Sequence, residues 1–118
     1  MKIFAFVLSF TLVCSSALGA FIDGLEDVPV MEGLIQTQND NISFGNEESR
    51  LVETVLIGEN TSFELVKKFY KKTLPQMGWI YQGARDSTVI FEREGEVMEI
   101  KRESEAPLRV IITVKSKI

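Results

Sequence analysis

Histidine is absent from this sequence of 118 residues, and cysteine occurs once, at Cys14. Zinc sites built from cysteine and histidine, a Ser-His-Asp relay and disulfides within the chain are therefore excluded. If Cys14 is removed with an N-terminal signal, the mature chain also has no thiol nucleophile. These absences exclude several common kinds of catalytic and metal site.

Basic residues are too few for a general nucleic-acid-binding protein. The chain has 13 Lys and Arg against 17 Asp and Glu, which gives a formal net charge of −4. Binding to a phosphate backbone needs a basic footprint, and this composition does not supply one. Nucleic acid is therefore not an expected partner.

Residues 1–20 have the pattern of a signal peptide. Lys2 gives a positive start, an apolar run covers residues 3–13, and small residues follow up to Ala20. The run is shorter than the roughly 20 residues of a spanning helix, so we expect cleavage and no transmembrane segment in the mature chain. Lipoprotein anchoring through Cys14 is the less favoured alternative, because Val13 is not the small residue that a lipobox requires. An exported chain without disulfides is more typical of a bacterial periplasm than of eukaryotic secretion.

Residues 61–79 predict an amphipathic helix with a sharp C-terminal end. Thr61 followed by Glu64 is a capping-box pattern. Pro75 and Gly78 favour a stop, after which an extended run begins at Trp79. Apolar residues recur at three- and four-residue spacing and form one stripe. The stripe consists of Phe63, Val66, Phe69, Tyr70, Thr73, Leu74 and Met77.

Five later segments have the composition or alternation of strands, and short turns between the last four predict antiparallel hairpins. We expect an α+β fold over residues 49–118. In this fold one amphipathic helix packs on an antiparallel four-stranded sheet in the order β-α-β-β-β. The strand segments are 50–57, 79–84, 88–93, 96–102 and 108–114.

The helix stripe needs an apolar partner, which one face of the sheet would supply. At roughly 1.5–3 kcal/mol for each large apolar side chain, such a core can hold a domain of this size. The expected core is Val66, Phe69, Tyr70, Met77, Ile80, Met98, Ile100, Val110 and Ile112.

Residues 21–48 are acidic and rich in turn residues, and their apolar residues follow no sustained period. We interpret them as an extended acidic arm that precedes the α+β domain and docks on it in part. The apolar content of the arm is high for a disordered segment.

Acidic residues are frequent between residues 92 and 105, but their positions favour charge pairing over catalysis. Acid–base chemistry needs two carboxyl groups in one cleft with separated pKa values. Here the carboxylates alternate with Arg93, Lys101 and Arg102 at outward strand positions and hairpin ends. The segment from Asn39 is a poor calcium loop, because Phe44 stands where glycine is needed. We expect no enzymatic activity, no catalytic residue, no cofactor and no metal site.

Two features are candidates for partner binding. Lys67, Lys68, Lys71 and Lys72 form a basic stripe on the helix of an acidic protein, where they would either meet an anionic partner or keep an outer face soluble. Trp79 and Tyr81 lie two residues apart and so share one face of a strand. That face is either core or an exposed aromatic patch for a partner, and the sequence leaves both open.

The run Phe69-Tyr70, Leu74-Pro75, Gly78-Trp79 resembles a motif of small exported proteins of Gram-negative bacteria, in which a helix ending FY…LP..GW leads into an antiparallel sheet. The segment from Gly24 to Leu34 is similar to an element that precedes this domain in such proteins. The resemblance implies a periplasmic domain with a helix on a sheet. It implies no activity, because these proteins are mostly of unassigned function.

Taken together, these patterns predict a non-enzymatic binding or adaptor domain of the bacterial envelope that contacts another protein. One alternative is a carrier of a small ligand or lipid, with a cavity between helix and sheet lined by Phe69, Tyr70 and Met98. A hydrolase that uses carboxylates alone is a further alternative, which the outward alternation disfavours.

Overall fold

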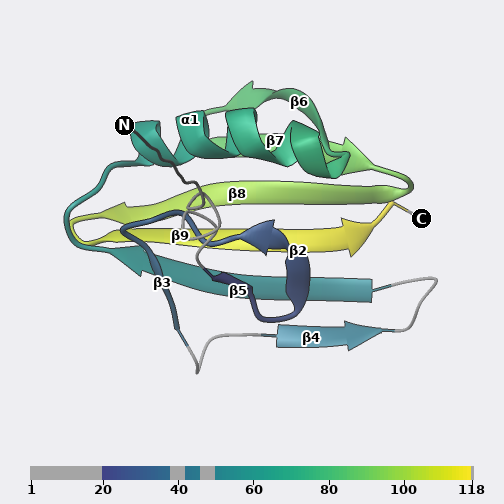
Figure 1. Cartoon of the computed structure of the whole chain (residues 1–118), viewed down its shortest axis with the longest axis horizontal. Coiled ribbons are helices and arrows are strands. Elements are labelled where there is room, and N and C mark those ends of the chain that lie inside the picture. Colours follow the sequence, from purple (N-terminus) through teal and green to yellow (C-terminus); the bar gives the residue numbers. More distant parts are fainter. Residues whose placement is uncertain (1–19, 38–41, 46–49, 118) are drawn as a thin grey trace, which may run out of the picture.

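The computed structural model describes residues 20–37, 42–45 and 50–117 (Figure 1). The predicted signal peptide lies outside these residues except for Ala20, and so does Cys14. One helix, α1 (Phe63–Thr73), continues into a short 3-10 helix, η2 (Leu74–Met77). The strands are β1 (Phe21–Ile22), β2 (Leu25–Pro29), β3 (Ile35–Gln36), β4 (Ile42–Gly45), β5 (Arg50–Gly58), β6 (Ile80–Arg85), β7 (Thr88–Arg93), β8 (Glu96–Glu105) and β9 (Leu108–Ser116).

The expected fold class is wrong, because the described chain is mostly β. Seven strands form one antiparallel sheet in the order β3-β5-β9-β8-β7-β6, with β4 also paired to β5, and β1 pairs with β2 in a second sheet. The order β-α-β-β-β omitted one of the five strands indicated after residue 48, and all four strands before Arg50. These four strands have two to five residues, too few for alternation to reveal them. β3 and β4 form where they do because the edge of β5 offers unpaired backbone groups.

The four strands after the helix confirm the predicted segments. Two residues separate β6 from β7, β7 from β8, and β8 from β9. Asp86, Glu94 and Gly95 have φ angles of 54°, 44° and 87°. This left-handed backbone matches the twist of tight hairpins, which explains why β6 lies beside β7 and β7 beside β8.

The helix begins one residue later than the capping pattern predicted. Ser62, not Thr61, is the N-cap, and its Oγ accepts a hydrogen bond from the Leu65 amide at 3.3 Å. Thr61 instead packs against Gly58, where an added Cβ would lie only 2.7 Å from the threonine methyl group. The predicted C-terminal stop is confirmed: Gly78 has φ 93°, and the Trp79 amide donates to the Leu74 carbonyl at 3.1 Å.

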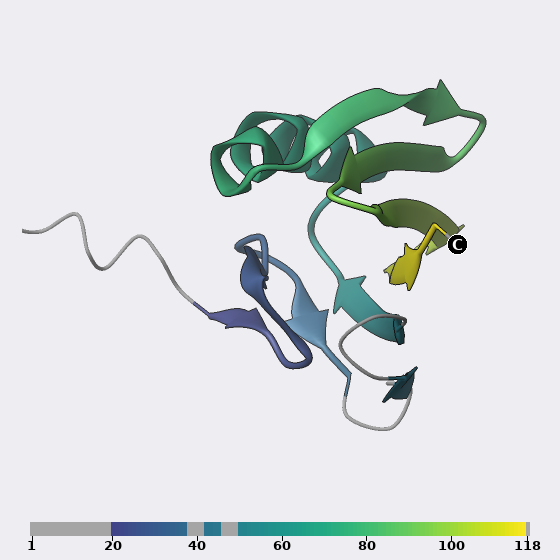
Figure 2. The ribbon, with the colours of Figure 1, turned by 90° about the vertical axis from the view of Figure 1, so that its right-hand side faces the viewer.

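The sheet is curved, and both the helix and the β1–β2 hairpin lie on its concave side (Figure 2). The core therefore combines the helix stripe with apolar residues of the arm, among them Ile22, Leu25 and Val28, all at most 1% exposed. Of the expected core, Phe69 and Met77 are partly buried. Those fully buried are Val66, Tyr70, Met98, Ile100, Val110 and Ile112.

Ile80 was wrongly assigned to the core. It lies on the edge strand β6, where it pairs with Glu92 of β7, and it is 64% exposed. Because successive side chains of a strand alternate, Trp79 and Ile80 cannot both point inward. Trp79 takes the inner position and is 1% exposed.

Candidate functional site

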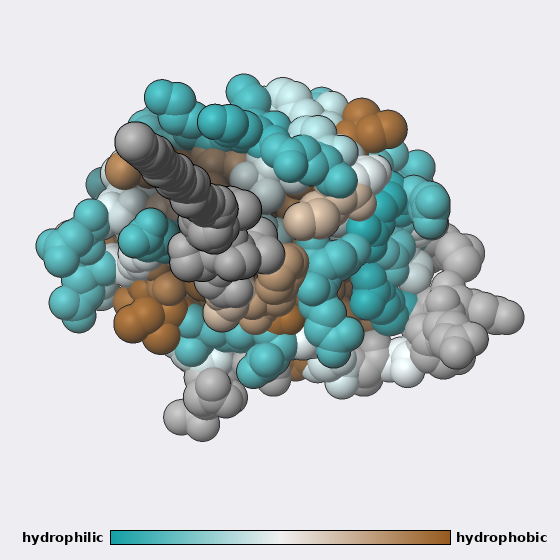
Figure 3. Space-filling model, in the orientation of Figure 1, coloured by the Kyte–Doolittle hydropathy of each residue, from teal (hydrophilic) through white to brown (hydrophobic). Residues whose placement is uncertain are grey.

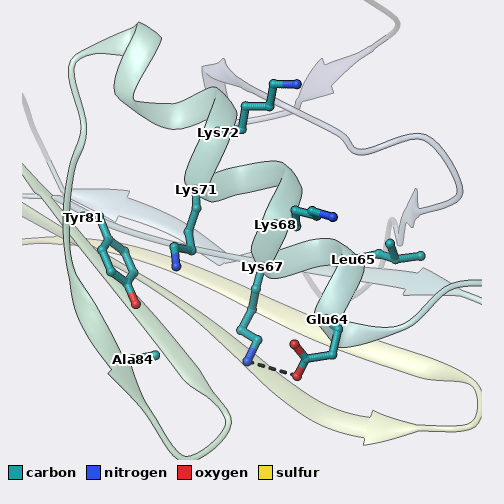
Figure 4. Close-up of a pocket in the computed structure, with 8 residues that line it drawn as sticks. All are labelled: Glu64, Leu65, Lys67, Lys68, Lys71, Lys72, Tyr81 and Ala84. Carbon is teal, nitrogen blue, oxygen red and sulfur yellow. Dashed lines mark ion pairs between the residues drawn. The ribbon is translucent and has the colours of Figure 1, made fainter.

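An open groove runs between the outer side of α1 and the edge strand β6, with a volume of about 600 Å³ (Figure 4). We call it the lysine groove. Figure 3 shows the hydrophilic side chains that follow α1 on this side of the molecule. The groove is lined by Glu64, Leu65, Lys67, Lys68, Lys71, Lys72, Tyr81 and Ala84.

The helix supplies one wall because its two sides differ in polarity. Phe63, Val66 and Tyr70 are buried against the sheet. The lysines that follow Val66 and Tyr70 in sequence therefore lie on the outer side of the helix. In Figure 4, Lys67 and Lys71 extend toward β6, whereas Lys68 and Lys72 point away from it.

Strand β6 supplies the other wall through a bulge. Tyr81 pairs with Phe91 and Ala84 pairs with Val89, and both partners are buried on the helix side of the sheet. The register shifts between Tyr81 and Gly83, which places two residues three apart in sequence on the same face. Gly83 has φ 135°, a conformation that favours glycine. The sequence analysis missed Ala84, and Gly83 inside a predicted strand was the available signal.

The lysines of the groove exceed the acidic groups that could neutralise them. Lys67 pairs with Glu64 at 3.1 Å, and the Lys71 ammonium lies 4.6 Å from the centre of the Tyr81 ring. No carboxylate of the described residues forms an ion pair with Lys68, Lys71 or Lys72. The groove therefore carries an excess positive charge on a protein with a net charge of −4.

Trp79 and Tyr81 occupy the same face of the chain but different surroundings. Trp79 is buried, and the Arg93 guanidinium lies 4.2 Å from the centre of its ring. Tyr81 is 38% exposed and makes an edge contact with Phe91, with ring centres 5.6 Å apart. The structure thus brings Tyr81 together with the four lysines and places Trp79 in the core.

The carboxylates of the strands have basic partners. Glu105 pairs with Arg102 at 2.7 Å, Glu92 pairs with Lys117 at 3.1 Å, and Glu96 pairs with Arg50. The hydrogen bond that Arg50 donates to Glu96 raises the pKa of the Arg50 guanidinium, although burial opposes it. No group of three or more potential metal ligands occurs within the described ranges. The Arg50–Glu96 contact links β5 to β8, whereas Arg102 and Glu105 both lie on β8.

The space between helix and sheet is filled where a carrier would need a cavity. Tyr70 and Met98 are fully buried, and the Tyr70 hydroxyl donates a 2.6 Å hydrogen bond to the Pro29 carbonyl. A second pocket, of about 270 Å³, lies at the start of α1 and is lined in part by Thr61, Arg102 and Leu108. Neither this pocket nor the lysine groove is lined by Phe69, Tyr70 or Met98.

Comparison with protein-family models, curated proteins and solved structures finds no match to this chain. The resemblance to small exported bacterial proteins therefore stays a prediction. In the part of the chain that the structure describes, no helix is both long and apolar enough to cross a membrane.

Proposed function

We propose that the protein is an exported, non-enzymatic binding protein of the bacterial envelope, and that it binds another protein through the lysine groove. The observation that carries this proposal is the excess of lysine side chains beside an exposed tyrosine, in a groove of about 600 Å³. Tyrosine is enriched at protein interfaces, whereas lysine is not, and a local positive field attracts an acidic partner.

The alternative without a binding role is that the lysines only keep the outer face of the helix soluble. It accounts for Lys68 and Lys72, which point to solvent. It does not account for the concave surface that Lys67 and Lys71 line together with β6, where the Lys71 ammonium lies over the Tyr81 ring. The carrier alternative has less support, because the cavity that it needs is occupied by Tyr70 and Met98.

Cross-linking in the envelope of the native host tests the proposal. The double substitution Lys67→Glu and Lys71→Glu should remove a cross-linked protein partner that the wild-type protein captures, because the groove would become acidic. The matched control is Lys101→Glu with Lys115→Glu. These two lysines are also exposed, but they follow Ile100 and Val114, which point into the core, so they lie on the opposite face of the sheet.

The control should retain the partner, and circular dichroism should show that both variants fold. Equal capture by the groove variant and the wild-type protein would contradict the proposal. Loss of capture by both variants would also contradict it, since the effect would then follow overall charge and not the groove.

A further inference from the structure

The two lysines that extend over β6 have a defined spacing. Lys67 and Lys71 are four residues apart on α1, so their attachment points lie about 6 Å apart along the helix axis. In an extended chain, side chains on the same side are two residues apart, a separation of about 6.6 Å. Carboxylates at alternate positions of an extended segment therefore match the spacing of the two attachment points along the helix.

The contacts that these lysines make within the protein are easily exchanged. The ion pair of Lys67 is with Glu64, whose side chain is 82% exposed, and such pairs contribute little to stability. Lys71 lies over the half-exposed ring of Tyr81, where a cation–π contact is weak. Both ammonium groups are thus held in place, yet both can accept a carboxylate from outside.

The shape of the groove favours a chain segment over a membrane or a small ligand. It is open along its length, whereas small-molecule sites enclose most of their ligand. A flat anionic membrane would reach Lys68 and Lys72, which point outward, more readily than the pair turned toward β6.

We infer that the occupant of the lysine groove is an extended acidic segment of a protein, with carboxylates at alternate positions that pair with Lys67 and Lys71. This inference rests on the proposed function and specifies the chemistry of the partner. The small side chain of Ala84 leaves room for the backbone of the segment, and the Tyr81 ring offers an apolar contact.

Fluorescence anisotropy with two labelled peptides of equal composition tests the inference on the purified protein. One peptide carries glutamate alternating with serine, and the other carries the same glutamates side by side. The alternating peptide should bind more tightly, by about threefold, and more weakly as salt is added. Lys67→Gln and Lys71→Gln should each remove this preference. Lys101→Gln and Lys115→Gln are controls on the opposite face of the sheet, and should preserve it.

Each contrary result has a distinct meaning. Equal binding of the two peptides would overturn the inference, and the proposed function would stand if the charge reversal still removed the cross-linked partner. Binding to vesicles of phosphatidylglycerol and phosphatidylethanolamine in equal parts, without peptide binding, would overturn it in favour of a lipid surface. Selective binding of the alternating peptide without a captured envelope protein would support the inference and contradict the proposed function.

Discussion

The concave face of the sheet has two covers, and they are built differently. Helix α1 covers one part, and the β1–β2 hairpin of the arm covers the other (Figure 2). Both covers bury large side chains completely, such as Leu74 at the end of α1 and Leu25 on β2. The spacing of apolar residues predicts the buried face of the helix, whereas the apolar residues of the arm follow no period.

The arm compensates for its short strands with long-range anchors. Its apolar residues enter the core, and polar contacts hold its backbone. The Tyr70 hydroxyl binds the Pro29 carbonyl, Arg93 pairs with Asp27, and Gln36 Nε2 donates to Thr54 Oγ1 at 2.8 Å. A segment without a periodic sequence pattern is here as much a part of the core as the helix.

The largest expected effect comes from a matched pair of core truncations. Leu25→Ala in the arm and Leu74→Ala at the helix end should each lower the free energy of unfolding by about 2–5 kcal/mol, because both side chains are at most 1% exposed. Urea denaturation measures both. A cost below about 1 kcal/mol for Leu25→Ala alone would show that the arm is not part of the cooperative unit.

A smaller effect is expected at the contact between the two covers. Tyr70→Phe should cost about 1–2 kcal/mol at neutral pH, because the buried Pro29 carbonyl loses its donor. Chemical denaturation of both proteins gives this difference, and an unchanged stability would mean that the hydroxyl does not hold the arm.

The same tyrosine predicts a dependence on alkaline pH. Burial raises the pKa of the Tyr70 phenol above its ordinary value of 10.0, so the folded state retains a proton that the unfolded state releases. The stability that the protonated Tyr70 phenol contributes is fully present below pH 10. The free energy of unfolding then falls as the pH rises above 10, by up to about 1.4 kcal/mol per pH unit. Tyr70→Phe should lack this component, so the two stability curves should converge in alkali.

The smallest expected effect concerns the ion pair that ties β2 to the β7–β8 hairpin. Asp27→Asn should cost only about 0.5 kcal/mol, and less at high salt, because the Asp27 side chain is 44% exposed. The neighbouring exposed Glu26 has no ion pair within the described residues, so Glu26→Gln is the control and should leave the free energy of unfolding unchanged. A loss above 2 kcal/mol for Asp27→Asn would mean that charge, and not apolar burial, holds the arm.

Prediction from the sequence succeeded where neighbours in the chain decide the structure. The stop at Gly78 follows from its own backbone freedom, and the turn at Glu94 and Gly95 follows from the residues that occupy it. It failed at Ile80, which has the composition of a core residue. Whether a strand residue is covered depends on which neighbours lie over its face, and β6 is an edge strand.

The candidate site was predictable only in part. The lysines and Tyr81 were candidates from their spacing and chemistry. Their contact was not predictable, because the path of β6 beside α1 depends on the pairing of β6 with β7. Trp79 could equally have been core or surface until the sheet face was known.

The sequence by itself determined the helix, its C-terminal stop and the hairpins from β6 to β9. These depend on contacts between residues a few positions apart, and such contacts leave a period or a turn pattern. Only the tertiary structure decided that the arm forms strands and that a groove lies between α1 and β6. The bulge at Gly83 sets the face of Ala84. β3 takes its hydrogen-bond partners from β5, about twenty residues away. Contacts over such distances leave no local pattern in a chain, because any segment with free backbone groups can make them.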